Sequence, residues 1–212
     1  MLLYYITDRT QFNGNESRRR TKLLLRIEAA VEQGVDFIQL REKDLSIGQL
    51  ESLSREVTDI VRASPASRTK LLINSRVDVA IAVDADGVHL RANDLSPHDV
   101  RKAWPEAGSA HPAVIGVSCH TESEVAEAAR TGADFAVFGS VFQKKDANDF
   151  VARGIDGLHL ACAHGIAVLA LGGVTVENAA ACRTAGAEGI AGIRLFQEGD
   201  LAESVAKLRR LG

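Results

Sequence analysis

Short apolar runs alternate with longer amphipathic stretches along the chain. Short runs rich in apolar and β-branched residues are typical of buried strands, whereas apolar residues spaced three or four positions apart are typical of helices. The predicted strands are Leu2–Thr7, Phe37–Arg41, Leu71–Asn74, Gly87–Leu90, Val114–Ser118, Phe135–Gly139, Ala167–Leu171 and Gly189–Ile193. The predicted helices are Ser17–Gln33, Ile47–Ala63, Val77–Val83, Pro97–Trp104, Glu122–Arg130, Asp156–Ala163, Val176–Ala185 and Leu201–Leu211.

The regular order of these elements predicts the fold class. Each strand is followed by a helix, which indicates a parallel sheet, and eight such units predict an α/β fold of the closed (β/α)8 TIM-barrel type. No linker or composition break divides the chain, so residues 1–212 are expected to form a single TIM-barrel domain. A doubly wound open sheet is the alternative, but the glycine-rich GxGxxG turn that it often carries is missing after the first strand.

The composition of the chain argues against nucleic-acid-binding and membrane functions. The chain has 212 residues with a formal net charge of −3, which indicates neither a nucleic-acid-binding surface nor a basic membrane-binding patch. No apolar run approaches the ~20 residues that a bilayer crossing needs. Three widely spaced cysteines without a CxxC pair suit a reducing cytosol, so a cytoplasmic location is expected.

Candidate chemistry gathers after the second strand. Gln39, Arg41 and Lys43 share one face of that strand because side chains alternate between the two faces. Two cations and an amide are costly to bury without partners. They predict a cavity that receives an anion; a solvated run of charges is the alternative.

Further polar groups follow the other strands, as expected for a barrel enzyme whose reacting groups lie at the carboxyl ends of its strands. Gly172-Gly173 before a predicted helix indicates a phosphate cradle, because glycine lets backbone N–H groups approach an anion; a tight turn that merely needs glycine is the alternative. Arg194, after the last strand, strengthens the phosphate interpretation.

His120 is the candidate general acid or base, since an imidazole titrates near pH 6.5 and its parity with Ser118 points it toward the barrel axis. A hydrogen-bonded loop histidine is the alternative reading of His120. His89 is expected to be structural. The cysteines are expected to fill the core, and Cys119 should point away from the axis.

Several motifs together resemble the thiamine phosphate synthase/TenI family. They are Tyr5-Ile6-Thr7-Asp8, Gln39-Leu40-Arg41-Glu42-Lys43, Asp86-Gly87-Val88-His89-Leu90, Gly116-Val117-Ser118-Cys119-His120 and Leu171-Gly172-Gly173-Val174.

The resemblance implies a barrel that works on thiazole phosphate in thiamine biosynthesis. In the synthase branch, the thiazole is joined to a pyrimidine diphosphate, and pyrophosphate is released with magnesium. By resemblance, substrate contacts fall to Gln39, Arg41, Lys43, Asn74 and Ser118, the thiazole phosphate to Gly172, Gly173, Ile193 and Arg194, and Mg²⁺ to Asp94.

Departures from the synthase pattern favour the TenI-like branch. The expected Asn-Asp after the third strand is Asn74-Ser75, so one of two metal carboxylates is missing. The run 143–147 lacks the threonines expected to hold pyrophosphate, although Lys144 and Lys145 are present as point charges. Arg153-Gly154 resembles the TenI branch, and Arg194 replaces the usual serine of the last phosphate loop.

The leading hypothesis is therefore a TenI-like thiazole tautomerase that needs no cofactor. His120 would shuttle the proton, and Arg41 and Lys43 would hold the substrate carboxylate. The rivals are a thiamine-phosphate synthase using Mg²⁺ at Asp94, a non-catalytic thiazole- or thiamine-phosphate-binding regulator, and a sugar-phosphate isomerase. The expected ligand is a small phosphorylated thiazole, and a homodimer is expected by resemblance alone.

Overall fold

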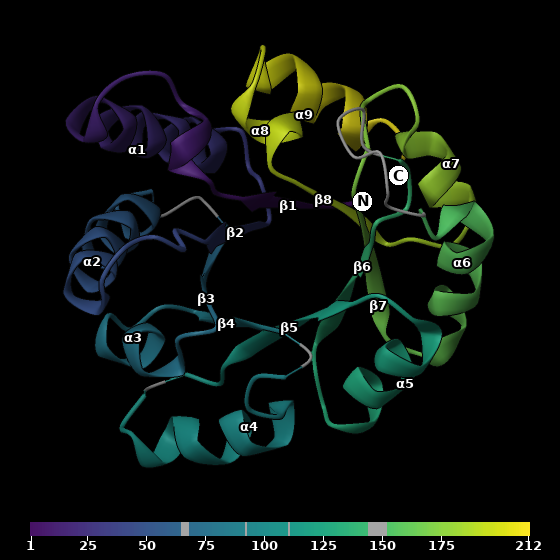
Figure 1. Cartoon of the computed structure of the whole chain (residues 1–212), viewed down its shortest axis with the longest axis horizontal. Helices are drawn as coiled ribbons and strands as arrows, with labels where there is room; N and C mark the ends of the chain where they lie inside the picture. The colour runs from purple at the N-terminus through teal and green to yellow at the C-terminus, as the bar shows by residue number, and fades with distance from the viewer. Residues whose placement is uncertain (65–67, 92, 110, 144–151) are drawn as a thin grey trace.

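Eight parallel strands close into a ring in the computed structural model, which describes residues 1–212 except 65–67, 92, 110 and 144–151 (Figure 1). Each strand pairs with its neighbours in chain order, and the last pairs with the first. The predicted (β/α)8 barrel is confirmed. The strands are β1 (Leu2–Ile6), β2 (Phe37–Leu40), β3 (Lys70–Asn74), β4 (Gly87–Leu90), β5 (Val114–Cys119), β6 (Phe135–Gly139), β7 (Ala167–Leu171) and β8 (Gly189–Gly192).

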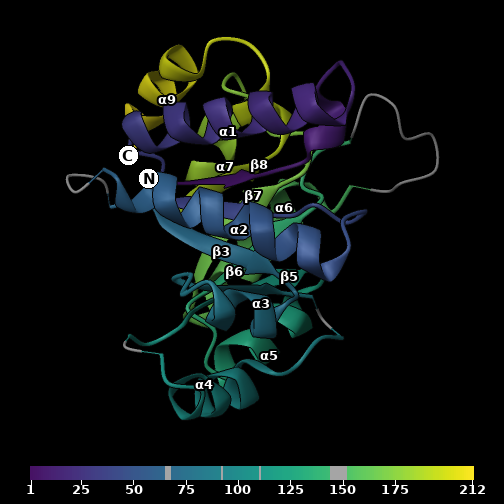
Figure 2. The same ribbon diagram turned by 90° about the vertical axis from the view of Figure 1, so that its left-hand side faces the viewer.

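Helices surround the ring on its outside (Figures 1 and 2). None in the described ranges combines the length and apolar character that a membrane crossing needs. The α-helices are α1 (Glu16–Glu32), α2 (Ile47–Arg62), α3 (Val77–Ala82), α4 (Pro97–Glu106), α5 (Glu122–Arg130), α6 (Gly154–Ala161), α7 (Ala179–Thr184), α8 (Arg194–Gln197) and α9 (Leu201–Arg209), and the 3-10 turns are η1 (Arg9–Gln11) and η2 (Cys162–His164).

The start of α7 was predicted wrongly, and a side chain explains the difference. The helix begins at Ala179 instead of Val176. Asn178 accepts a hydrogen bond from the Thr175 N–H (2.8 Å) and donates one to the Gly173 carbonyl (3.0 Å). These bonds close a turn ahead of the helix, as asparagine side chains often do. The N-terminus of this helix, which was expected at Val176, therefore lies further from Gly173 in the sequence.

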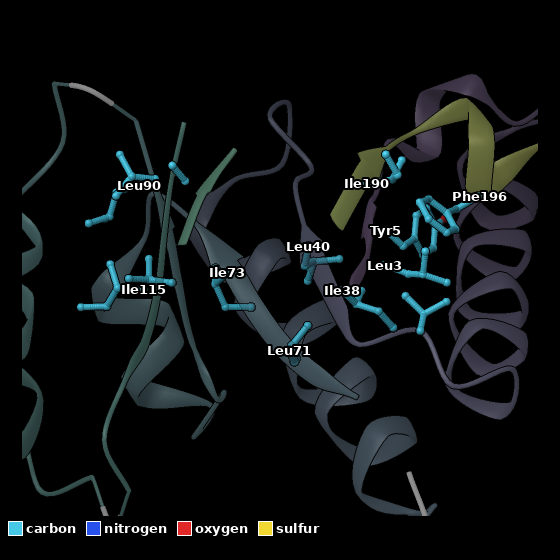
Figure 3. Close-up of a cluster of buried hydrophobic side chains, with 14 of the residues drawn as sticks. Leu3, Tyr5, Ile38, Leu40, Leu71, Ile73, Leu90, Ile115, Ile190 and Phe196 are labelled. Atoms are coloured by element: carbon cyan, nitrogen blue, oxygen red, sulfur yellow. The ribbon is translucent and has the colours of Figure 1, made fainter. Parts of the chain in front are cut away.

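The strands separate two apolar layers, because successive side chains point to opposite faces. Outward-facing residues such as Leu3, Ile38 and Leu71 pack under the helices, and Figure 3 shows this outer layer reaching Phe196 of α8. The smaller inner layer fills the barrel itself, with Tyr4, Ile6, Leu72, Phe135, Val137, Leu169 and Ala191.

Aromatic rings close the inner layer toward the amino ends of the strands. Tyr4 packs edge-on against Phe135, with ring centroids 5.4 Å apart. The ring centroids of Phe37 and Phe135 are 5.0 Å apart. Gly116 makes room for this packing, since an added Cβ would come within 2.5 Å of the Phe135 ring. Polar side chains of the inner face therefore lie above an apolar floor.

Candidate active site

Arg41 lies half-buried just past the end of β2. Its backbone N–H donates to Thr7 Oγ1 (3.0 Å), but its guanidinium makes no hydrogen bond or ion pair with any described residue. Burial lowers the pKa of Arg41. Lys43, which is exposed, has its pKa lowered first by the charge of Arg41, then by burial and by Arg91. The positive charges of Arg41 and Arg91 thus repel that of Lys43, and a bound anion would relieve this repulsion.

A buried ion pair that the sequence did not reveal positions this cation cluster. Glu42, between Arg41 and Lys43 in the sequence, accepts hydrogen bonds from Thr7 Oγ1 (2.6 Å) and Arg9 Nη1 (3.1 Å). The same guanidinium binds both carboxylate oxygens of Asp44, at 2.7 and 2.9 Å. Arg9 and Glu42 are buried. The pair ties η1 to the loop after β2.

A cavity of about 380 Å³ opens beside this loop. Its polar lining includes Lys43, Asn74, Ser75 and Arg91, from the ends of β2 and β3 and the loop after β4. A cavity of about 350 Å³ lies at the opposite end of the barrel, around the amino ends of β3 and β4. The two cavities have similar volumes, so their linings distinguish them. Lys43, which forms no ion pair with a described residue, lines the first.

Gln39 and Ser118 both point into the barrel, as predicted, but at different depths. Gln39 is only 1% exposed and donates a hydrogen bond to the Tyr4 hydroxyl (2.9 Å), whereas Ser118 is half-buried. His89 lies between them, hydrogen-bonded to Tyr4 and Ser118, and burial lowers its pKa to about 3. The expected structural role of His89 thus includes a direct link to a predicted site residue.

His120 follows β5 and reaches the end of β6. Its Nδ1 lies 2.7 Å from the Gly139 carbonyl oxygen. Because a carbonyl can only accept, Nδ1 carries a hydrogen, and in the neutral ring the lone pair is then on Nε2. The His120 backbone N–H donates to the Glu124 carboxylate, which fixes the start of the loop. The imidazole is thereby oriented at the carboxyl ends of the strands, and its Nε2 has no hydrogen-bond partner among the described residues.

The paired glycines lie where β6 and β7 end. Gly172 and Gly173 have positive φ angles of 93° and 65°. An added Cβ at Gly172 would come within 2.1 Å of Ser140 Oγ, and one at Gly173 within 2.8 Å of Phe142 Cβ. Loop packing thus requires both glycines. In addition, the Gly173 N–H donates to no acceptor among the described residues.

Two further residues, Ile193 and Arg194, were predicted at the phosphate position. Ile193 immediately precedes α8, and Arg194 is the exposed first residue of that helix. The sequence did not predict α8, because the four-residue helix is too short to show a period.

Two of the three cysteines fill the core as expected, whereas Cys162 is only partly buried. Cys119 and Cys182 are buried in the outer layer, and burial raises the pKa of Cys119 to about 12 and that of Cys182 to about 11. Both thiols stay protonated near neutral pH, so neither is a ready nucleophile.

Comparisons with known proteins agree with this arrangement. The family model described as thiamine monophosphate synthase matches residues 3–196. The chain belongs to this family. A putative thiamine-phosphate synthase 2 of Aquifex aeolicus is 36% identical over 197 residues, covering 92% of this chain and 97% of that protein. A thiamine-phosphate synthase of Chloroflexus aurantiacus is 35% identical over 210 residues, covering 98% and 90%.

A solved structure shares both fold and length with this family member. Thiamine phosphate pyrophosphorylase from Pyrococcus furiosus matches with a TM-score of 0.80 and 29% identity, covering 99% of this chain and 94% of that one. The family relation and the closed barrel expected from the motifs are therefore both shown.

The magnesium position expected in the family is altered here. Asp94 accepts hydrogen bonds from the Arg91 backbone N–H (2.8 Å) and from Arg91 Nη2 (2.9 Å). Burial raises the pKa of Asp94, but bonds from Arg91 and Ser75 outweigh it and the pKa falls. Ser75 supplies no carboxylate, and no group of three acidic, histidine or cysteine side chains converges among the described residues. With one carboxylate, itself held by arginine, this donor set would hold Mg²⁺ only together with substrate phosphates and water.

The remaining predicted groups are Lys144 and Lys145. Both lie outside the described residues.

Proposed function

We propose that this protein is a thiamine-phosphate synthase that joins thiazole phosphate to a pyrimidine diphosphate. The observation that carries the proposal is a pair of separate anion-receiving positions at one end of the barrel. One is formed by the unpaired Arg41 with Lys43 and Arg91, and the other by the backbone around Gly173. A reaction between two phosphorylated substrates needs two such positions. A tautomerase would use the same two, with Arg41 and Lys43 on a substrate carboxylate, so the names of the relatives are what favours the synthase.

The cation cluster suits the diphosphate. When the bond between the pyrimidine methylene carbon and the diphosphate oxygen breaks, negative charge grows on the departing pyrophosphate. Fixed cations in a partly desolvated position stabilise such charge without reorganising, which is the usual source of electrostatic catalysis. The Arg9–Glu42 pair would hold Arg41 and Lys43 in place for this task.

Full-length relatives support the same choice. Proteins that match more than nine-tenths of this chain carry the name thiamine-phosphate synthase, putative in one case. The leading hypothesis from the sequence, a TenI-like tautomerase, therefore becomes the second candidate.

Two observations favour that second candidate. His120 presents a free Nε2 that suits proton transfer, and the magnesium position is altered by Ser75 and by the Arg91–Asp94 pair. In a tautomerase, His120 would move one proton between two positions of the thiazole ring system, while the Gly173 loop would hold the phosphate.

One pair of assays decides between the candidates. The purified protein is incubated with thiazole phosphate and pyrimidine diphosphate, and pyrophosphate release is followed with Mg²⁺ or with a chelator. In parallel, conversion of the thiazole tautomer alone is followed by NMR. Stoichiometric release of pyrophosphate with formation of thiamine phosphate supports the synthase. Thiazole conversion without any such release supports the tautomerase, and tight binding without turnover contradicts both.

His120→Ala separates the roles further. In a tautomerase, the loss of a general acid or base lowers turnover by about 100-fold or more. His98→Ala is the matched control, because His98 is an exposed histidine on α4. Equal turnover in the two variants would show that His120 transfers no proton.

A further inference from the structure

Four polar side chains from four strands form a chain of hydrogen bonds inside the barrel. Gln39 Nε2 donates to the Tyr4 hydroxyl (2.9 Å), which lies 3.1 Å from His89 Nδ1. His89 Nε2 lies 2.8 Å from Ser118 Oγ. Gln39, Tyr4 and His89 are between 0 and 2% exposed, whereas Ser118 is half-buried at the open end.

The donors in this chain can be assigned one after another. The Gln39 amide gives its hydrogen to the Tyr4 oxygen, so the Tyr4 hydroxyl hydrogen needs an acceptor of its own. Within the described part of the chain, the only remaining partner of that hydroxyl is His89 Nδ1. Nδ1 must therefore be the nitrogen without a hydrogen. The opposite assignment would leave a hydroxyl hydrogen unpaired in a fully buried place, which is unfavourable.

The neutral imidazole then carries its one hydrogen on Nε2. Burial, followed by the charge of Arg41, lowers the pKa of His89 to about 3, so the ring is neutral at working pH. The Nε2 hydrogen points at Ser118 Oγ, which accepts it. The Ser118 hydroxyl hydrogen is left to turn toward the mouth of the barrel.

We infer that the chain Gln39–Tyr4–His89–Ser118 fixes His89 as the Nε2–H tautomer and makes Ser118 a hydrogen-bond donor to the ligand. The ligand atom that faces Ser118 is then an acceptor, such as a ring nitrogen or a carbonyl, carboxylate or phosphate oxygen, and not an N–H group. This inference deepens the proposed function by naming the polarity of one ligand contact. Tyr4 and His89 are positioning residues that act through Ser118.

The tautomer is measured without any turnover. In the ¹⁵N-labelled protein, long-range ¹H–¹⁵N correlations separate the two His89 nitrogens by their shifts. We expect a protonated Nε2 and a bare Nδ1. A protonated Nδ1 in the wild-type protein would overturn the inference.

Gln39→Glu tests the direction of the chain with a side chain of the same size. Above the pH at which the new carboxyl ionises, which the same NMR titration locates, it only accepts. It then takes the Tyr4 hydroxyl hydrogen, and His89 Nδ1–H donates to the Tyr4 oxygen. We expect the tautomer to change to Nδ1–H. An unchanged Nε2–H signature in the folded variant would show that Gln39 does not set the direction.

Tyr4→Phe provides a second variant in case Gln39→Glu fails to fold. It keeps the ring but removes the hydrogen bond that His89 Nδ1 accepts from the Tyr4 hydroxyl. We therefore expect both His89 tautomers to be populated. Tyr5→Phe is the matched control, because Tyr5 lies on the opposite face of β1 and its hydroxyl has no partner among the described residues. An unmixed Nε2–H signature in Tyr4→Phe would contradict the inference.

The inferred hydrogen bond from Ser118 to the ligand is tested by adding thiazole phosphate. If an acceptor atom faces Ser118, binding leaves His89 as Nε2–H, and Ser118→Ala weakens the affinity about tenfold. If binding converts His89 to Nδ1–H, a donor faces Ser118 and the inference fails. Absence of turnover would count against the proposed function alone, since neither the tautomer nor the affinity depends on it.

Discussion

Removing Arg9 should expose how strongly the site depends on a buried ion pair. Arg9→Met keeps an unbranched side chain of comparable length but leaves Glu42, which is buried, without a cation. The exposed carboxylates of Glu16 and Asp44 return to water at little cost, since more than half of each side chain is already exposed. The main loss is therefore the uncompensated charge of Glu42.

The expected loss is large because breaking a buried pair from one side typically costs about 3–5 kcal/mol. For a domain of this size, each kcal/mol corresponds to roughly 2–4 °C in Tm, so the variant should melt roughly 6–20 °C lower at pH 7. Thermal unfolding followed by circular dichroism measures this difference.

The loss should also depend on pH. Burial raises the pKa of Glu42, while hydrogen bonds from Thr7 and Arg9 lower it, so removing Arg9 raises the folded-state pKa further. A raised folded-state pKa destabilises the protein as pH rises above the unfolded value of about 4.3. The difference in Tm between wild type and Arg9→Met should thus be small near pH 4.5 and largest near pH 7.5.

A matched control and a rescue sharpen the result. Arg130→Met removes an arginine whose pair with Glu127 is exposed, and it should leave Tm almost unchanged. Adding Glu42→Gln to Arg9→Met removes the stranded charge and should recover part of the loss. A deficit that is below 2 °C, or equal at both pH values, would refute the reasoning from buried charge.

Three further outcomes are expected. Arg41→Met should raise the apparent KM for the diphosphate substrate about tenfold or more with no loss of Tm, because Arg41 has no partner among the described residues; a lower Tm with normal kinetics would contradict this. Arg91→Ala should release Asp94, so adding Mg²⁺ should change turnover more in the variant than in the wild-type protein; equal responses would argue against Arg91 occupying the metal position. Gly173→Ala should weaken thiazole phosphate binding and lower Tm by about 5 °C, because a left-handed backbone and contact with Phe142 both oppose a Cβ; an unchanged Tm would show that the loop adapts.

The fold could be predicted from the hydrophobic periodicity of the sequence, and part of the site from the alternation of faces along the strands. The alternation of apolar runs and helical patterns predicted all eight strands, because each strand is buried on both faces. Parity alone placed Gln39 and Ser118 inside the barrel and Cys119 outside it.

Contacts between distant segments explain what the sequence missed. Nothing local marks Arg9 as the partner of Glu42, since 33 positions separate them and the pairing of β1 with β2 brings them together. The depth of Gln39 follows likewise from its bond to Tyr4, on a different strand. Asn178 delays α7 through a turn that a helical pattern does not reveal. The expected homodimer and cytoplasmic location stay predictions, because neither the barrel nor the residues at its strand ends test them.

The aromatic floor formed by Tyr4, Phe37 and Phe135 fills the barrel below the polar side chains. A molecule that contacts Ser118 would therefore approach from the carboxyl ends of the strands. Where two substrates are stacked at that end, the deeper one binds first and leaves last, so an ordered binding sequence would follow from the floor.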